Sequence, residues 1–369
     1  MTMPMTPPLD LASAFAPWSG TEGHGTPITT GSTFIALRHR APRMSVVVIA
    51  RRRPALLARC LDALLAQSLP GAAFEIVVVD VGHDAATHRV VEAAADHARR
   101  ADGPDLRYYD SRAPLGPAGA RNRGWRLARA DVVAFTDDDA VPDREWLRAG
   151  EDAFHDASVV AARGRVQATS EFAPDDDATL VAPPQPTSFA TASAFVRRHA
   201  LIAIGGFDER FTQAPSDAAD LFLSLVEHYG DDAIAPTPAA LVRHPTPPFR
   251  FGDALARQRE RESESLLHAK HPTAGERFLG SRSMPSLHAV VVGACALALV
   301  VAPELPGPAL ALASAAAGLC LGLAAVRLRG APKTPRRIAD AVLTSFALPF
   351  VSLWWRLVGA WRWRTARVA

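Results

Sequence analysis

Three consecutive carboxylates constrain the fold of this chain more than any other feature. Asp137, Asp138 and Asp139 directly follow the apolar run at 132–136 (VVAFT), which is short, β-rich and typical of a buried strand. Adjacent like charges repel one another, so a fold that keeps them must offset their charge, and hard divalent cations commonly do so through oxygen ligands. Carboxylates at the carboxyl end of such a strand lie where open α/β sheets bind ligands. We therefore expect Mg²⁺ or Mn²⁺ here, holding a nucleotide diphosphate.

A second acidic triple, Asp175–Asp177, serves as an internal comparison. No strand pattern precedes it, and Pro174 marks a loop. The sequence predicts a solvated turn at this place, so strand context and not the number of acids distinguishes the two triples.

Apolar runs alternate with helical patterns through the first part of the chain. The runs at 45–50, 74–79, 105–109 and 132–136 are typical of strands, and helices are expected after Pro54, over 88–97 and within 116–130. This alternation predicts an α/β fold with a mostly parallel central sheet and flanking helices. Further expected elements are strands at 33–37, 159–163, 166–168 and 190–195 and helices at 197–204, 221–229 and 251–270.

The chain changes character near residue 286. The uncharged apolar runs at 287–302 and 307–326 are joined by the short turn 303–306 and predict a transmembrane hairpin, with a buried helical pair as the alternative. The basic residues that follow, between 327 and 337, place that loop and the domain before the hairpin in the cytoplasm. A third apolar segment, 338–358, is followed by more arginines, so an interfacial or re-entrant helix fits better than a third span.

Charge is divided unequally along the chain. The formal net charge is +2, yet residues 281–369 hold ten Lys and Arg against two Asp and Glu, so the preceding part is acidic. The basic tail favours a membrane surface and argues against a nucleic-acid-binding main domain. The spacing of Cys60, Cys295 and Cys320 fits no zinc or disulfide framework, which suits a reducing cytoplasm. The amino-terminal residues show no pattern of a signal peptide.

Four segments, taken in order, resemble the family 2 glycosyltransferases, which have the GT-A fold and use nucleotide-sugar donors. The resemblance covers residues 45–272 and is carried by SVVVIARRRPALLARCLDALLAQ, FEIVVVDVGH, GPAGARNRGWRLARADVVAFTDDD and FATASAFVRRHALIAIGGFDERF. It implies an irregular segment at 1–43, a GT-A domain at 44–280 and a membrane-anchoring region at 281–369.

The resemblance also implies roles for the donor side of the site. Asp80 would accept a hydrogen bond from the nucleobase, with capping of a turn as the alternative. Asp137 would contact the nucleoside and, together with Asp139, bind the metal that bridges the diphosphate, while Asp138 would support them. Arg121 and Asn122 would approach the nucleotide, although Arg121 fits a helix-surface arginine equally well.

Two further elements resemble the family less closely. His244 follows an apolar run and would complete the metal shell, with a purely structural histidine as the alternative. Gln258 and Arg261 match part of a Gln-x-x-Arg-Trp element of processive members, but Glu262 stands in place of the Trp. Charges on a helix face are the favoured interpretation of this pair.

The chain departs from the family in its loops and at the base. Ala50 and Arg52 stand where a Thr and an Asn are usual, within a segment that reads Arg51, Arg52 and Arg53 after the strand, and Val81 and His83 replace two residues of the acidic turn. These arginines would contact a diphosphate or form a basic surface loop. Ala218 occupies the position of the usual general base, and Asp217 is the neighbouring candidate, with capping of the following helix as its alternative.

The resemblance thus implies a bacterial, membrane-anchored enzyme. It would be an inverting transferase that moves a sugar from a nucleotide diphosphate to a lipid-linked or cell-envelope glycan acceptor at the cytoplasmic membrane face. The altered base motif leaves open a catalytically silent GT-A protein that binds or scaffolds in glycan assembly. The sugar, the nucleotide and the acceptor stay open.

Overall fold

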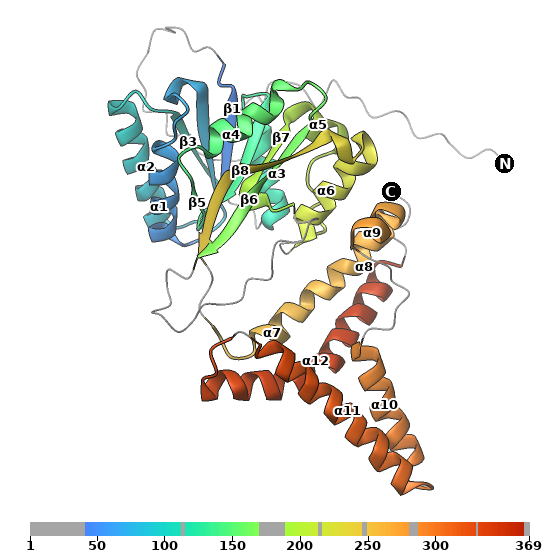
Figure 1. The fold of residues 1–369 in the computed structure, drawn as a ribbon. Coiled ribbons are helices and arrows are strands. Elements are labelled where there is room, and N and C mark those ends of the chain that lie inside the picture. The colour runs from blue at the N-terminus through green and yellow to red at the C-terminus, as the bar shows by residue number, and fades with distance from the viewer. Residues whose placement is uncertain are drawn as a thin grey trace, which may run out of the picture.

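A computed structural model describes residues 41–111, 115–169, 189–212, 216–245, 249–279, 287–329 and 331–364 (Figure 1). The strand expected at 33–37 and the second acidic triple lie outside these ranges.

One eight-stranded sheet with the order β3-β2-β1-β4-β7-β6-β8-β5 forms the centre of the fold. Strands β3, β2, β1 and β4 run parallel, and so do β6 and β8, whereas β7 is antiparallel to β4 and β6, and β5 is antiparallel to β8. The sheet is therefore mostly parallel, as the alternation of strands and helices predicts. The strands are β1 (Met44–Ala50), β2 (Phe74–Asp80), β3 (Asp105–Asp110), β4 (Val132–Asp137), β5 (Val141–Pro142), β6 (Ala161–Thr169), β7 (Ala194–Arg197) and β8 (Ile234–Pro245).

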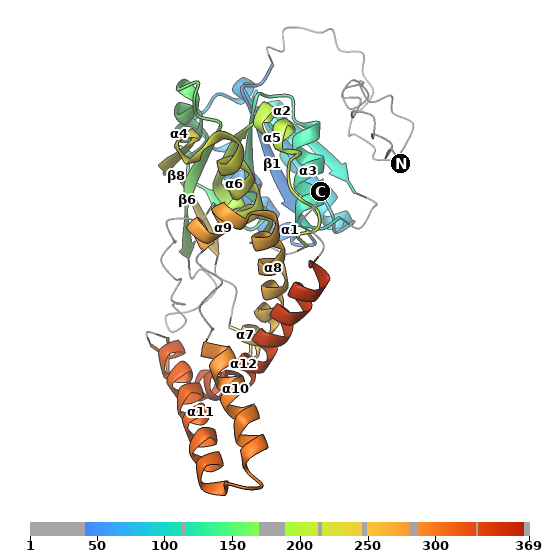
Figure 2. The ribbon, with the colours of Figure 1, turned by 90° about the vertical axis from the view of Figure 1, so that its right-hand side faces the viewer.

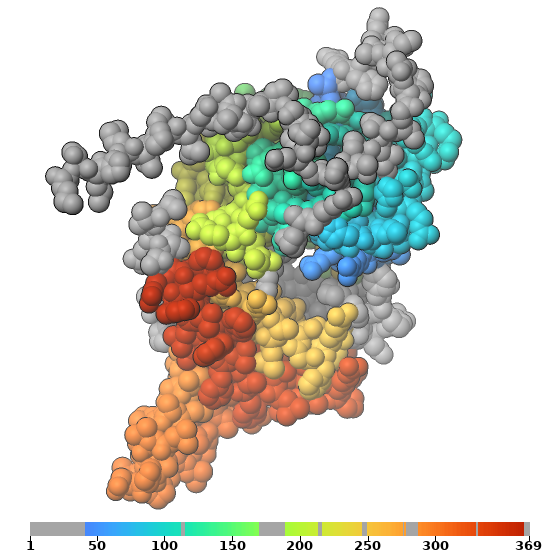
Figure 3. All heavy atoms as spheres, turned by 180° about the vertical axis from the view of Figure 1, so that it is seen from behind, coloured from blue at the N-terminus to red at the C-terminus, as the bar shows by residue number. Residues whose placement is uncertain are grey.

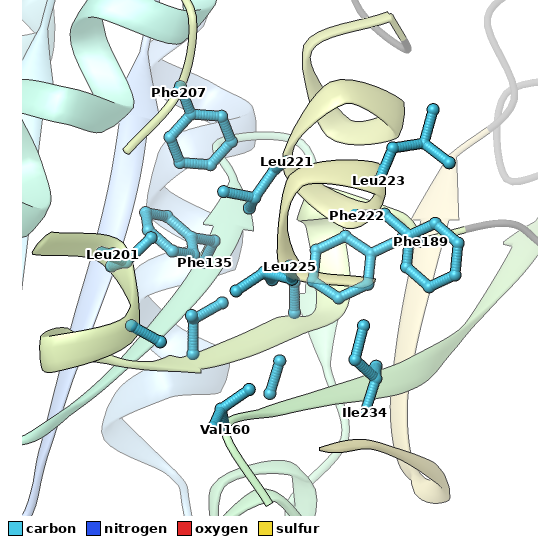
Figure 4. Packing of buried hydrophobic residues seen from close by; sticks show 14 of the residues in the cluster. Phe135, Val160, Phe189, Leu201, Phe207, Leu221, Phe222, Leu223, Leu225 and Ile234 are labelled. Carbon is cyan, nitrogen blue, oxygen red and sulfur yellow. The ribbon is translucent and has the colours of Figure 1, made fainter. Parts of the chain in front are cut away.

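Helices cover both faces of the sheet and close two apolar cores. Buried residues of α1 (Pro54–Leu65), α2 (Ala85–Arg100) and α4 (Trp146–Asp152) pack with the side chains that β1 and β2 direct to one face. On the other face, α3 (Pro117–Leu127), α5 (Arg198–Ile204) and α6 (Ser216–Tyr229) pack on β4 and β7. Figure 4 shows this second core, in which Phe135 of β4 lies near Phe207 and Leu221. The rings of Phe135 and Phe207 meet edge to face with centroids 5.2 Å apart.

Local chemistry explains where the elements differ from their predicted bounds. Helix α2 begins at Ala85 because the Asp84 carboxylate accepts hydrogen bonds from the Ala86 and Thr87 amides and caps it. The two strands expected at 159–168 form the single strand β6, with a shift of register between Arg163 and Arg165. The long helix expected at 251–270 is instead α7 (Asp253–Ala256), a 3-10 turn and α8 (Glu260–Lys270).

Four helices follow α8 in the described residues, α9 (Pro272–Leu279), α10 (Leu287–Val301), α11 (Pro306–Arg327) and α12 (Pro335–Arg362). We call the last three the tail helices. Helices α10 and α11 lie side by side and extend away from the sheet (Figure 2). Within the described residues, α11 and α12 are long and apolar enough to cross a membrane, whereas α10 is shorter. Large apolar side chains on α10 and α11 face outward, among them Leu299, Val300 and Leu310, which are 78%, 75% and 69% exposed.

Helix α12 is apolar outside and polar inside. Its exposed apolar side chains recur every three or four residues and so form one stripe along the helix, whereas its buried face holds several hydroxyl and carboxyl groups. The stripe consists of Leu343, Phe346, Phe350, Trp354, Leu357 and Trp361, and the buried polar residues are Asp340, Thr344, Ser345 and Ser352. This polarity is the reverse of that of a helix on a water-soluble protein.

We call the sheet and the helices α1 to α6 that cover it, residues 44–245, the sheet domain. The second half of α12 returns to this domain. It runs beside α8, as Figure 3 shows from behind. A Cβ atom at Gly359 would lie 2.6 Å from the Glu262 carbonyl oxygen, so the two helices approach as closely as only glycine permits. Arg362 Nη1 lies 2.7 Å from Glu262 Oε1, and Trp363 packs against the core of the sheet domain.

Candidate active site

The carboxyl ends of β1 and β4 lie next to each other and bring charges of opposite sign together. Ile49 of β1 pairs with Asp137 of β4, so the residues that follow β1 face the acidic triple. The Arg53 guanidinium contacts the carboxylates of both Asp138 and Asp139. The Arg51 amide donates to Asp138 Oδ2 at 2.9 Å. Part of the charge of the triple is therefore offset by the protein itself.

Asp138 is the buried member of the triple. Burial raises the pKa of its carboxyl despite the neighbouring Arg53, and its side chain is 1% exposed. Its bonds to the loop after β1 fit the supporting role that the resemblance implies.

Asp137, Asp139 and His244 form a group with metal-ligand geometry. One ligand atom from each residue lies within 4.8 Å of the other two, and His244 Nε2 lies 3.1 Å from Asp139 Oδ1. Strand β8 supplies His244 just before its end and thereby brings it to the end of β4. Within the described chain, Asp139 Oδ1 is buried and accepts no well-directed hydrogen bond. Two carboxylates and an imidazole suit a divalent cation as ligands, and the Asp139 oxygen still has room to accept one.

The protein holds Asp139 in the form that a metal ligand requires. Burial alone would raise the pKa of its carboxyl, but the neighbouring His244 and Arg53 bring that pKa below its usual value. In turn, Asp139 raises the pKa of His244. Asp139 is therefore an anion at neutral pH.

Arg121 joins the acidic triple to Asp217. Its guanidinium is 3.0 Å from Asp137 Oδ1 through Nη2 and contacts Asp217 through Nη1. Arg121 is only 4% exposed and lies over the Phe207 ring at 5.8 Å, so the helix-surface alternative is wrong. Asp217 is fully buried in the first turn of α6, where burial raises the pKa of its carboxyl.

Asn122 uses its amide group entirely within the protein. Its nitrogen donates to the Phe207 carbonyl at 2.8 Å and to Glu209 Oε1 at 2.9 Å. Its oxygen accepts from the Phe207 amide and from Trp125 Nε1, both at 2.9 Å. The side chain therefore holds the turn after α5, and the predicted nucleotide contact would require it to give up one of these bonds.

Asp80 lies buried at the end of β2. Its carboxylate accepts from the Gly82 amide at 2.7 Å and from the Tyr108 hydroxyl at 2.9 Å, which fits the turn-capping alternative. Burial and Asp80 raise the pKa of Tyr108, so the hydroxyl stays protonated and donates. A Cβ atom at Gly82 would lie 2.8 Å from the Arg52 amide nitrogen, so the loops after β1 and β2 approach closely. The nucleobase contact of Asp80 stays a prediction.

Gln258 and Arg261 make contacts within their own helical segment. Gln258 Nε2 donates to the Ala254 carbonyl at 3.1 Å, and Arg261 pairs with Glu264. These contacts agree with charges on a helix face.

Comparison with known proteins agrees with this geometry. Residues 45–206 match the family model described as glycosyl transferase family 2. This stretch, which spans β1 to α5, is therefore similar to that family. The fold is also that of a mannosyltransferase from Pyrobaculum calidifontis, solved with GDP-Man and Mn²⁺. The two structures align with a TM-score of 0.57 and 21% identity over 85% of this chain and 88% of that one.

Curated relatives match part of this chain over part of their own length. Glycosyltransferase AglE from Haloferax volcanii is 27% identical over 128 residues, which are 35% of this chain and 40% of AglE. A pre-mycofactocin glycosyltransferase from Mycobacterium tuberculosis is 31% identical over 144 residues, covering 35% of this chain and 30% of the relative. The chain thus spans less than half the length of these relatives.

Proposed function

We propose that the chain is a metal-dependent inverting glycosyltransferase. It would move a sugar from a nucleotide diphosphate to a lipid-linked or cell-envelope glycan acceptor at the cytoplasmic face of the membrane. The observation that carries this proposal is the continuous arrangement in which Arg121 joins Asp137 of the metal-ligand group to the buried Asp217. Donor binding and proton removal would thereby be placed next to each other.

In this proposal Asp137, Asp139 and His244 hold Mn²⁺ or Mg²⁺. The bound cation would neutralise charge on the diphosphate as it leaves. Arg53 keeps the neighbouring carboxylates compensated, and Asp80 and Asn122 shape the loop and the turn on either side of the nucleotide.

Transfer would be a single displacement. The acceptor hydroxyl oxygen bonds to the anomeric carbon from the side opposite the diphosphate. The bond from that carbon to the diphosphate oxygen breaks, and its electron pair leaves with the diphosphate. The hydroxyl proton passes to Asp217, whose raised pKa makes it a stronger base than an ordinary aspartate. Attack on the opposite side inverts the anomeric carbon.

The tail helices support a place at the membrane. The outward apolar side chains of α10 and α11 suit a hairpin in lipid, and the stripe of α12 suits a helix lying in the headgroup layer. Because the end of α12 packs on α8 and on the sheet domain, α12 would stay on the domain's side of the bilayer. The basic residues between α11 and α12 favour the cytoplasmic side.

A screen of nucleotide sugars tests the proposal. The full chain in nanodiscs, with Mn²⁺ present, is heated with each nucleotide sugar in turn. A bound donor at 100 times its Kd should stabilise the fold by about 2.7 kcal/mol. Asp139→Ala should abolish this shift, whereas the exposed Asp152→Ala should retain it.

Transfer itself is then measured with the donor that binds. Sugar moved to lipid-linked acceptors supports the proposal, and binding without transfer would instead favour the catalytically silent scaffold. Failure of every nucleotide sugar to bind, together with an unaltered Mn²⁺ affinity in Asp139→Ala, would overturn the proposed transferase.

A further inference from the structure

A cluster of charges around the buried Asp220 and His271 lies outside the site described above, where α8 meets α6 and the turn after α5. Lys270 Nζ lies 2.8 Å from Asp220 Oδ1 and 3.1 Å from Asp208 Oδ2. His271 Nε2 lies 2.9 Å from Asp220 Oδ1, and its Nδ1 lies 2.6 Å from Glu227 Oε2. We call Lys270 and His271 the α8 clamp.

Lys270 and both ring nitrogens of His271 in the α8 clamp are paired with carboxylates. Asp220 is 0% exposed and the His271 side chain 2%. A carboxylate accepts hydrogen bonds, so each His271 nitrogen that faces one has to donate. Buried ions cost several kcal/mol each unless they are paired in good geometry, and an apolar cluster of similar volume is often as stable. We therefore expect these charges to fix the position of α6 rather than to add to the stability of the fold.

Asp220 and Asp217 lie one turn apart on the same side of α6. Asp217 is paired with Arg121 on the donor side, and Asp220 is paired with the α8 clamp. Helix α6 is thus held by ion pairs at two neighbouring positions, and a shift of either would move Asp217.

The α8 clamp also contacts the turn after α5, which packs against Arg121. Asp208, bonded by Lys270, directly follows Phe207, whose ring lies under the Arg121 guanidinium. The clamp therefore holds both segments that pack against Arg121, namely the start of α6 and the turn after α5.

The other end of α8 belongs to the tail helices. Glu262 receives the close approach of Gly359 and pairs with Arg362, both on α12. One helix thus contacts α12 near its beginning and the α6 network at its end.

We propose that Lys270 and His271 are positioning residues that fix Asp217 on the acceptor side of the site and make sugar transfer depend on the seating of α8 against α12. This inference rests on the proposed function. The groups proposed to bind the donor lie at the ends of β1, β2, β4 and β8 and on α3, and Lys270 and His271 pair with none of them directly, so we expect donor affinity to change little.

Three variants test the inference in the full chain in nanodiscs. Lys270→Met and His271→Gln each break the clamp, and Gly359→Leu pushes α12 away from α8. Each should lower kcat about 100-fold, the loss that a displacement of about 1 Å causes in a reacting geometry. The Kd of the donor with Mn²⁺ should stay within about threefold.

Rescue and control variants separate positioning from general loss of structure. Lys270→Arg keeps both ion pairs and should restore kcat to within about fivefold of wild type. Arg277 lies on α9, the helix after α8, and forms an exposed ion pair with Asp231. Arg277→Ala removes this pair and should leave kcat and Kd unchanged. Unchanged kcat in Lys270→Met, or a parallel loss of kcat and donor affinity that Lys270→Arg does not rescue, would overturn the inference.

Hydrogen exchange keeps the test independent of turnover. Peptides covering 216–229 should exchange faster in Lys270→Met than in wild type, while peptides covering 44–65 should not change. If the wild type transfers no sugar, the proposed function fails. In that case, equal protection of α6 in the two proteins also refutes the clamp, whereas faster exchange supports its holding of α6.

Discussion

Replacement of Asp217 by Asn examines the site most directly, because it removes the base and little else. The amide keeps the size of the side chain and an oxygen that accepts from the Ala218 amide, which lies 2.9 Å away. Arg121 keeps its contact with Asp137 at 3.0 Å, so the metal-ligand group retains its neighbour.

The expected loss is large in rate and small in stability. A positioned general base contributes about 10²–10⁴-fold, so kcat should fall by that factor, equivalent to about 3–5 kcal/mol. The neutral amide of Asp217→Asn cannot pair ionically with Arg121, but burial had already made the ionised Asp217 costly, as its raised pKa shows. Because these two effects oppose each other, we expect the free energy of unfolding to change by about 1–2 kcal/mol.

The assay is the pH dependence of transfer with saturating donor. Burial places the pKa of Asp217 above the usual value, so wild-type kcat should rise with pH as the carboxylate loses its proton and then level off. The residual activity of Asp217→Asn should lack this rise, and the exposed Asp231→Asn should keep it. A variant that retains more than about a tenth of wild-type kcat, with the pH limb intact, would refute Asp217 as the base.

Three other outcomes follow from particular contacts. Asn122→Ala leaves the Phe207 and Trp125 N–H groups without their acceptor and should lower the free energy of unfolding by about 2–4 kcal/mol, measured by urea titration. The pKa of Asp208 is about 2, since Arg210 and Lys270 outweigh the effect of burial. Asp208→Asn should therefore lower the free energy of unfolding by on the order of 1 kcal/mol at pH 7. The difference in unfolding free energy between the variant and the wild type should shrink as pH falls from 4 towards 2. Trp354 fluorescence in vesicles should be quenched more by lipids labelled near the headgroup than by lipids labelled at the chain end, and the opposite order would contradict an interfacial α12.

The sequence predicts the sheet domain well, because its signals are local. The β-branched runs at β1, β2 and β4 and the proline that opens α1 are each sufficient to identify an element. The full length of β8 is not predictable in this way, since Pro236 and Pro238 interrupt its apolar pattern. Its pairing with β6, which includes Ala168 opposite His244, overrides that pattern.

The acidic residues of the site are predictable together with their location, whereas the partners of its basic residues are not. Asp137 and Asp139 stand at the end of an evident strand, whereas Arg53 becomes their neighbour only because β1 lies beside β4 in the sheet. The pair of Arg121 and Asp217 joins residues 96 apart in sequence. No local pattern marks Lys270 and His271, since their partners lie on α6 and in the turn before it.

Helix α8 has a further consequence for where this protein can be divided. Leu266 and Leu267 pack into the core of the sheet domain, while Glu262 lies against Gly359. A chain shortened after residue 279 would keep α8 but leave the strip that α12 covers open to water. Such a fragment would be prone to self-association, although it would keep the ion pairs of Lys270 and His271 with α6. The sheet domain and the tail helices therefore share one helix, and neither part is complete without it.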